Sequence, residues 1–467
     1  MSIKKKYSTV RGLFERHAAG ESPAGFNVSL AGWVRTVRQS KEVGFLELND
    51  GSCQKNIQVV FGQEILDCPP ANGSAVEVRG TVAVSENPNA KAPLEVNAES
   101  VTILGSADAD YPISKKRHGF EYLRTVAHLR GRTNTFSAVF RLRSVLTFAI
   151  HEYLQKNGFV CVAAPCITSN DGEGAGEVVR ATTLDLRNVP KNPDGSVDFT
   201  KELLGGGRFL TVTGQLNVEP FCAVFRDVYT FGPCFRAENS NTARHAVEFW
   251  QVEPEMAFAD LEDVMDCIEG LTKHMIMSAL KYGADELAFF DAQIEPGLVR
   301  KLENTVNEPY ARVTYADALD ILKKSGEKFI MPVRWGGFQT EWEKYLAEKA
   351  FGRPVFVTDY PREEKAFYMR QNDDGATVSA ADLMFPGIGE VVGASAREER
   401  LDRLLARMGE TGLRPEDYWW YLDLRRYGTF PHGGFGLGVE RMMMFVTGMG
   451  NIRDVIPYPR TPGHAEF

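Results

Sequence analysis

One segment, residues 229–255 (YTFGPCFRAENSNTARHAVEFWQVEPE), constrains the fold more than any other part of the chain. Two stretches of strand composition, residues 229–235 and 247–252, flank a polar loop of Asn, Ser and Thr. The loop is longer than a tight turn and carries charges at both ends. The sequence therefore predicts an antiparallel β-hairpin with a charged mouth.

Four charged or titratable residues lie at the mouth of this hairpin. Arg236 and Glu238 end the outgoing strand, whereas Arg244 and His245 begin the returning strand. Guanidinium groups match phosphate oxygens in a two-pronged geometry, so this set predicts a bent polyphosphate ligand. Phe249, just inside the returning strand, can stack on a purine. The alternative interpretation is a solvated surface hairpin.

A second segment, residues 434–441 (GFGLGVER), has glycine at every second position. This spacing favours a strand pressed against a ligand, since side chains there would collide with it. Val439 stands where a dinucleotide fingerprint needs its third glycine, and the chain contains no Gly-Lys pair for a Walker loop. Residues 439–446 form an apolar helix pattern with Glu440 and Arg441 in its first turn, which predicts a phosphate-binding strand–helix junction.

The bulk composition excludes several classes of protein. Hydrophobic residues make up 43% of the 467 residues and charged residues 25%, as in ordinary globular proteins. The seven cysteines include no CxxC pair, which favours reduced thiols over a zinc site. No apolar run reaches the length of a membrane span and no signal-peptide pattern opens the chain, so we expect a cytoplasmic protein. The net charge of −9 argues against indiscriminate nucleic-acid binding but leaves room for a local basic face.

Short alternating strands dominate residues 27–104. Their breaks fall at Asn, Gly and Pro clusters. Five short strands in fewer than a hundred residues favour a small barrel such as the OB-fold, a frequent reader of single-stranded nucleic acid. The expected strands are residues 27–39, 44–50, 56–62, 74–85 and 93–104.

A basic stretch and an amphipathic helix follow the predicted barrel. Residues 106–134 lack a clear pattern, and we expect a linker that either contacts nucleic-acid phosphate or serves only as a charged hinge. Its basic residues are Lys115, Lys116, Arg117, His118, Arg124, Arg130 and Arg132. Apolar residues then recur at helical spacing over 135–157, Gly158 suits a left-handed helix end, and a strand over 159–163 precedes Pro165.

Four segments together resemble a known family: FRAENSNTARH, FWQVEPE, YGTFPHGGFGLGVER and IRDVIPYPRTP. They are similar to motifs two and three of the class II aminoacyl-tRNA synthetases, in the asparagine branch of bacterial type, and the resemblance covers nearly the whole chain. It implies an α+β fold with an OB-fold anticodon-binding domain in residues 1–105 and the linker in 106–134. Residues 135–467 would form the catalytic domain, an antiparallel sheet flanked by helices, with a helical insertion near 260–350.

The resemblance implies a role for each motif residue. ATP-binding residues would be Arg236, Glu238, Arg244, His245, Phe249, Glu390, Gly438, Glu440 and Arg441, with Arg236 and Arg441 catalytic. Asparagine-binding residues would be Glu173, Thr213, Gln215, Glu253, Tyr368 and Arg397. Asp382 and Glu390 would hold Mg²⁺, whose preferred ligands are hard oxygens. Arg38, Phe45 and Gln58 would bind tRNA, although core packing is the alternative for Phe45.

Further expectations concern individual segments of the catalytic domain. By the resemblance, residues 359–370 form a strand that closes over the amino acid, with Phe367 and Tyr368 inside. Residues 188–207, rich in Asn, Pro, Asp and Gly, predict a mobile surface loop. Ala394 departs from the family's usual glycine, and would cost about 1 kcal/mol if the backbone there has a positive φ.

The implied activity is the ligation of L-asparagine to tRNA(Asn) with ATP, by a homodimer joined through residues 135–165. The chain contains no serine nucleophile elbow and no HExxH helix, which fits adenylation, since the substrate carboxylate is itself the nucleophile. A non-discriminating aspartyl-tRNA synthetase is the main alternative. An ammonia-ligating asparagine synthetase and a non-enzymatic OB-type RNA-binding protein are others.

Overall fold

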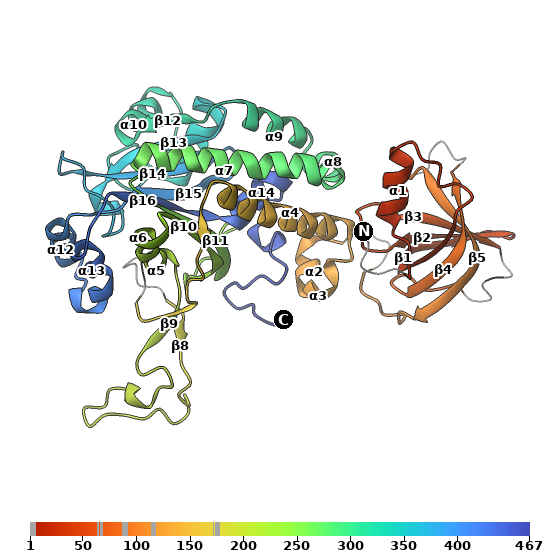
Figure 1. Cartoon of the computed structure of the whole chain (residues 1–467), viewed down its shortest axis with the longest axis horizontal. Helices are drawn as coiled ribbons and strands as arrows, with labels where there is room; N and C mark the ends of the chain where they lie inside the picture. The colour runs from red at the N-terminus through yellow and green to blue at the C-terminus, as the bar shows by residue number, and fades with distance from the viewer. Residues whose placement is uncertain are drawn as a thin grey trace. The chain divides into compact units, whose positions relative to one another are not determined.

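The structure is a computed structural model of the whole chain, and it describes residues 6–62, 65, 69–85, 92–113, 118–170, 172 and 178–467. The chain forms two compact units, residues 1–138 and 139–467. They are described separately below, and Figure 1 shows the helices and strands of each. Among the described residues, no helix is both long enough and apolar enough to cross a membrane.

The N-terminal unit contains a closed five-stranded barrel in the order β1-β2-β3-β5-β4. This confirms the predicted OB-fold. A helix, α1 (Val10–Ala18), precedes the barrel, and Thr9 caps it by accepting a hydrogen bond from the backbone of Gly12. The strands are β1 (Asn27–Gln39), β2 (Val43–Asn49), β3 (Ile57–Gly62), β4 (Ala75–Val84) and β5 (Leu94–Gly105).

Alternating side chains explain why these strands close into a barrel. In β2 and β3, every second residue points into a dry core; the inward residues include Leu46, Leu48, Ile57 and Val59, all fully buried. The intervening residues stay partly or fully exposed on the outer face. That outer face is therefore available to a ligand.

The basic linker is more ordered than its sequence indicates. It contains two short helices, α2 (Phe120–Thr125) and α3 (Ala127–Arg130). Arg130 is fully buried, with its guanidinium 4.4 Å from the centre of the Phe136 ring. A buried arginine cannot meet tRNA phosphate, so that alternative is wrong for Arg130. The predicted basic residues Lys115, Lys116 and Arg117 lie outside the described residues.

The C-terminal unit is built on an eight-stranded sheet, ordered β12-β13-β14-β15-β16-β11-β10-β6. The pairs at the two edges are parallel and the pairs between them antiparallel, which confirms the predicted architecture. Its strands are β6 (Val160–Cys161), β10 (Asp227–Phe235), β11 (Glu248–Ala257), β12 (Ala311–Thr314), β13 (Val355–Pro361), β14 (Thr377–Phe385), β15 (Gly389–Ala396) and β16 (His432–Gly438).

Two long helices, α4 (Asn134–Lys156) and α7 (Leu261–Tyr282), pack together beside this sheet (Figure 1). The helices can approach closely because two glycines lie opposite large side chains of α4. Gly270, within α7, contacts Tyr153, and Gly283, just after α7, contacts Leu142. Gly158, just past α4, has a φ of +89°, as predicted. Among the described residues of this unit, the remaining α-helices are α5 (Gln215–Val218), α6 (Cys222–Phe225), α8 (Ala284–Gln293), α9 (Leu298–Asn307), α10 (Tyr315–Lys324), α11 (Thr340–Tyr345), α12 (Leu401–Glu410), α13 (Trp419–Arg426) and α14 (Val439–Thr447).

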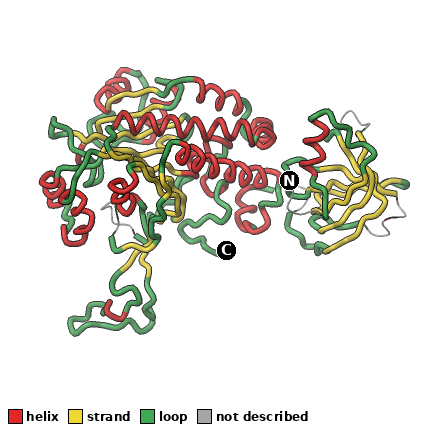
Figure 2. The backbone as a smooth tube through the Cα atoms, in the orientation of Figure 1, coloured by secondary structure: helices red, strands yellow, loops and turns green. Residues whose placement is uncertain are grey.

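Three sequence expectations need revision or comment. The strand predicted over 359–370 is wrong, because β13 ends at Pro361 and a 3₁₀ turn (Arg362–Glu364) follows. Residues 178–207 form an excursion from the body that Figure 2 shows mostly as loop, based on the paired strands β8 (Arg180–Ala181) and β9 (Arg208–Leu210). Ala394 lies within β15 and is absent from the described non-glycine residues of positive φ, so it adds no strain.

Candidate active site

A cavity of about 500 Å³ opens on the C-terminal unit, over the middle strands of the sheet. The β10–β11 hairpin, the strands β14, β15 and β16, the start of α14 and the segment after β13 all contribute to its wall. Every predicted site residue of this unit lines the cavity except Glu173, which lies outside the described residues. They are Thr213, Gln215, Arg236, Glu238, Arg244, His245, Phe249, Glu253, Tyr368, Asp382, Glu390, Arg397, Gly438, Glu440 and Arg441.

The hairpin places its arginines as the sequence predicts. Register pairs Phe235 with Glu248, so the polar loop between them arches over the cavity mouth. The Arg236 guanidinium lies 5.3 Å from the centre of the Phe249 ring, a cation–π contact that orients both groups. Arg244 reaches across the mouth and donates to the carbonyl of Gly387 at 3.2 Å.

The start of α14 adds a further cation. Arg441 donates to the backbone carbonyl of Glu390 at 2.6 Å and lies 3.6 Å from its carboxylate. Glu440 behaves differently, since its buried carboxylate accepts from Arg143 and from the backbone of Trp250. Glu440 thus anchors the helix start, and its predicted contact with ATP stays a prediction.

His245 lies among these cations and beside the Glu238 carboxylate. Its Nδ1 lies 2.5 Å from the Thr242 hydroxyl, and its Nε2 lies 3.9 Å from a Glu238 oxygen. Burial lowers the pKa of His245. The Glu238 charge opposes this change, and the charges of Arg441 and Arg236 add to it. The imidazole is therefore ready to gain a proton when an anion arrives.

Two carboxylates face one space beside the polyphosphate end. A β-carbon placed on Gly393 would lie 3.5 Å from Glu390 Oε1 and 3.7 Å from Asp382 Oδ1, so both acids look onto the same bare strand position. Burial raises the pKa of Asp382, although the Lys365 ammonium, 2.5 Å away, acts in the opposite direction. Within the described ranges, no three His, Cys, Asp or Glu side chains form a metal-binding group.

The far end of the cavity holds a different set of groups. Glu253 accepts from the Thr213 hydroxyl and, at 2.9 Å, from the backbone of Gly214. Arg397 is 2% exposed and lies 5.4 Å from the centre of the Tyr368 ring. Both Glu253 and Arg397 line the cavity, as predicted.

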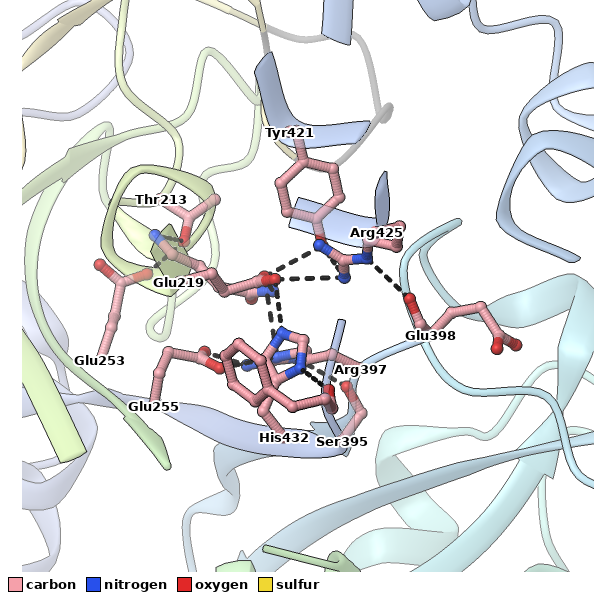
Figure 3. Close-up of polar contacts among 12 residues, drawn as sticks. Thr213, Glu219, Glu253, Glu255, Ser395, Arg397, Glu398, Tyr421, Arg425 and His432 are labelled. Atoms are coloured by element: carbon pink, nitrogen blue, oxygen red, sulfur yellow. Dashed lines mark hydrogen bonds and ion pairs between the residues drawn. The ribbon is translucent and has the colours of Figure 1, made fainter. Parts of the chain in front are cut away.

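Behind Arg397 lies a buried charge network that the sequence analysis missed (Figure 3). Glu255 accepts hydrogen bonds from both Nε and Nη2 of Arg397, the first at 3.0 Å, while Nη1 donates a hydrogen bond to Ser395 at 2.7 Å. Burial raises the pKa of Glu255 to about 7, with Arg397 opposing the change. This fork fixes the guanidinium plane.

The centre of the network is Glu219, which is 1% exposed. Its carboxylate accepts from Gln215 and Tyr421, and it pairs with Arg425 at 3.3 Å and His432 at 3.0 Å. Burial alone would raise the pKa of Glu219, but the His432 hydrogen bond and the Arg425 charge lower it to about 2. The one signal in the sequence was a pair of acids two residues apart, Glu253 and Glu255, in the half of β11 that is buried.

The alternating glycines serve this packing as well as the cavity. A β-carbon on Gly434 would collide with the Glu255 carboxyl group. The interpretation that this glycine admits a ligand is therefore wrong; it admits a buried side chain. Gly436 and Gly438 do line the cavity.

The predicted tRNA-binding residues lie together on the outer face of the barrel. Arg38 and Phe45 are paired across β1 and β2, and Gln58 is paired with Glu47 across β2 and β3. Directly paired residues point to the same face. Phe45 is 37% exposed, which excludes the core-packing alternative, and Gln58 donates to Glu95 at 3.0 Å.

Comparison with known proteins defines the class. The family model described as tRNA synthetases class II (D, K and N) matches residues 121–462, and that of the OB-fold nucleic acid binding domain matches residues 28–104. The chain belongs to the class II tRNA synthetases.

Within that class, its relatives are asparagine–tRNA ligases, and the chain belongs to their family. It is 56% identical over 452 residues to the asparagine–tRNA ligase of Clostridium novyi (strain NT), covering 96% of this chain and 97% of the relative. The fold agrees: asparaginyl-tRNA synthetase from Pyrococcus horikoshii, complexed with asparaginyl-adenylate, matches at a TM-score of 0.85 and 31% identity, over 99% of this chain and 100% of that one. The aspartyl-tRNA synthetase of Entamoeba histolytica, 22% identical over 100% of this chain and 95% of that one, shares the fold at a TM-score of 0.78.

Proposed function

We propose that this protein ligates L-asparagine to tRNA(Asn) through an asparaginyl-adenylate, and releases AMP and pyrophosphate from ATP. The observation that carries the proposal is a single cavity with two unlike ends. One end contains Arg236, Arg244, His245 and Arg441. The other end contains an acid, Glu253, and a cation, Arg397, whose guanidinium is held by Glu255. A polyphosphate suits the first end and a neutral amide the second.

In the first step, the asparagine carboxylate attacks the α-phosphorus of ATP and the bond to pyrophosphate breaks. Arg236, held against Phe249, binds the α-phosphate and stabilises the charge that grows on five-coordinate phosphorus. Phe249 and Glu238 hold the adenine. Arg244, His245 and Arg441 bind the leaving pyrophosphate, and the shared cavity aligns the two reactants.

Asp382 and Glu390 fit a divalent cation, because both oxygens face the bare strand position of Gly393. Two protein carboxylates with phosphate oxygens and water are a frequent ligand set for Mg²⁺. When bound, Mg²⁺ would neutralise charge on the polyphosphate.

Selectivity for asparagine over aspartate follows from the far end of the cavity. An asparagine side chain presents one acceptor and two donors, whereas aspartate presents acceptors only. Arg397 donates to the amide oxygen and Glu253 accepts from the amide nitrogen. Bound aspartate would set two carboxylates about 4 Å apart, which costs roughly 4 kcal/mol at an effective dielectric near 20.

In the second step, the terminal ribose 3′-hydroxyl of tRNA(Asn) attacks the adenylate carbonyl and displaces AMP. The barrel reads the anticodon, with a base stacked on Phe45 beside Arg38 and hydrogen-bonded by Gln58. We further propose a cytoplasmic homodimer joined through residues 135–165. Phe148 on α4 is 67% exposed and Val160 on β6 is 37% exposed, as expected of apolar residues that a partner covers.

An ATP–pyrophosphate exchange assay across the amino acids tests the proposal. Asparagine should drive exchange and aspartate should not, by a margin on the order of a thousandfold. Glu253→Ala should lower asparagine use and narrow that margin. Comparable exchange with both amino acids in the wild-type protein would assign it instead as a non-discriminating aspartyl enzyme.

A further inference from the structure

Lys365 lines the cavity but has no part in the two steps proposed above. It follows the 3₁₀ turn after β13, and its ammonium lies 2.5 Å from Oδ2 of Asp382. The side chains of Lys365 and Asp382 are only 15% and 12% exposed. This pair is therefore shielded from water and from salt far better than a surface ion pair.

The position of this ammonium conflicts with a divalent cation on Asp382. Oδ2 of the carboxylate holds Lys365, while Oδ1 faces the space beside Gly393 that Glu390 shares. An ammonium and a divalent ion on the two oxygens of one carboxylate would repel each other strongly in this partly buried site. Asp382 therefore cannot bind the ammonium and the divalent ion strongly at the same time.

The structure also gives the ammonium a second contact that does not depend on the carboxylate. Lys365 Nζ lies 3.9 Å from the centre of the Tyr360 ring, within cation–π range. A lysine stem is long and flexible, so its head can withdraw from Asp382 while keeping contact with the ring face. An ammonium displaced from Asp382 therefore keeps a favourable contact with the Tyr360 ring.

We propose that Lys365 is an internal counter-ion which competes with the divalent metal for Asp382. The inference rests on the metal site named under the proposed function. Once a metal takes the carboxylate, the ammonium turns toward the cavity, which receives the polyphosphate. Metal binding alone is thus weakened, and binding together with the nucleotide is favoured.

Titration of the protein with Mn²⁺ alone, followed by electron paramagnetic resonance, measures the competition. If Lys365 occupies Asp382 in about nine of ten molecules, Lys365→Met should bind Mn²⁺ about tenfold more tightly than wild type. Lys365→Arg, which keeps the charge, should stay near wild type. Lys349→Met removes an exposed lysine paired with Glu327, and its unchanged affinity would exclude an effect of net charge.

A second measurement needs no substitution at Lys365. Amine acetylation read by mass spectrometry should modify Lys365 faster when Mg²⁺ is added, while Lys349 reacts at a constant rate. Unchanged labelling of Lys365, together with equal Mn²⁺ affinity in wild type and Lys365→Met, would overturn the inference. Asp382→Asn separates the two proposals: if it binds Mn²⁺ as well as wild type, the metal site itself is misplaced.

Discussion

The two ends of the cavity handle charge in opposite ways. At the polyphosphate end, Arg244 and Arg441 donate to backbone carbonyls, and the Glu390 carboxylate lies 3.6 Å from Arg441, farther than a hydrogen bond. At the amide end, Arg397 and Arg425 are almost completely buried and matched by Glu255 and Glu219. Cations held by carbonyls keep most of their charge for a ligand, whereas cations already matched by acids present only a fixed pattern of donors.

This difference explains how one cavity serves catalysis and selectivity. Charge that increases during a reaction is best met by groups whose own charge is not yet neutralised. A neutral amide is best recognised by groups that cannot move and whose charges are already balanced, since moving them would break buried ion pairs. The four predictions below test this contrast, beginning with the largest expected effect.

Removing a cation at the polyphosphate end should affect the rate most. Arg236→Ala or Arg441→Ala should lower ATP–pyrophosphate exchange by a hundredfold or more, because a preorganised donor at a developing charge is worth about 3–4 kcal/mol. Arg414→Ala, which removes a surface arginine that is 74% exposed, is the matched control and should exchange normally. A folded Arg236 or Arg441 variant with near-normal exchange would remove that residue from the mechanism.

Removing an acid at the amide end should affect asparagine binding and spare ATP binding. Glu255→Gln breaks the fork that orients Arg397, and loss of a charge-assisted hydrogen bond of about 1.5–3 kcal/mol should raise KM for asparagine roughly tenfold to a hundredfold. KM for ATP should hardly change. Glu248→Gln, at the start of the same strand but outside the cavity lining, is the control. Equal increases in both KM values would show that Glu255 only stabilises the fold.

A change on the barrel should leave both ends of the cavity intact. Phe45→Ala should slow aminoacylation by about fivefold to a hundredfold, since a stacked base is worth about 1–3 kcal/mol. Asparagine-dependent exchange, which needs no tRNA, should continue at the wild-type rate. Phe26→Ala changes another exposed phenylalanine of this unit and should affect neither reaction. A parallel loss of both activities would contradict anticodon stacking.

The smallest effect concerns proton uptake by His245. Burial holds its pKa below the ordinary value in the free protein, and a bound polyphosphate favours the protonated form, so the pKa rises on binding. Binding then takes up a proton, so ATP should bind more tightly as pH falls through the pKa of the imidazole in the complex. The pH dependence of ATP affinity in His245→Asn gives the contribution of ATP's own titration, which is subtracted. Identical pH profiles would exclude proton uptake at His245.

The polyphosphate end could be predicted from the sequence because its residues lie in two short motifs. Arg236, Glu238, Arg244 and His245 fall within ten residues, and a hairpin brings them together whatever the rest of the chain does. The amide end could be predicted only in part. Glu253 and Arg397 came from the family resemblance. Of the acids that hold the cations in place, only Glu255 had a local signal, its spacing from Glu253, and nothing local marked Glu219.

Long-range packing explains what was missed. Glu219 meets His432 across 213 positions and Arg425 across 206, and no local pattern links residues so far apart. The strand expected over 359–370 failed for a related reason. Its polar residues lie where Pro361 and a 3₁₀ turn end β13, and this break brings Lys365 to Asp382.

The span of these contacts has a consequence for the growing chain during synthesis. All barrel strands lie between residues 27 and 105, so the anticodon-reading unit has its strands long before translation ends. The amide end must wait for His432, the first residue of β16, because Glu219 would otherwise be buried without a full set of partners, at a cost of several kcal/mol. A ribosome that stalls before residue 432 would therefore release a chain with an organised barrel but no organised amide end. Such a fragment could hold a tRNA anticodon but could not select asparagine.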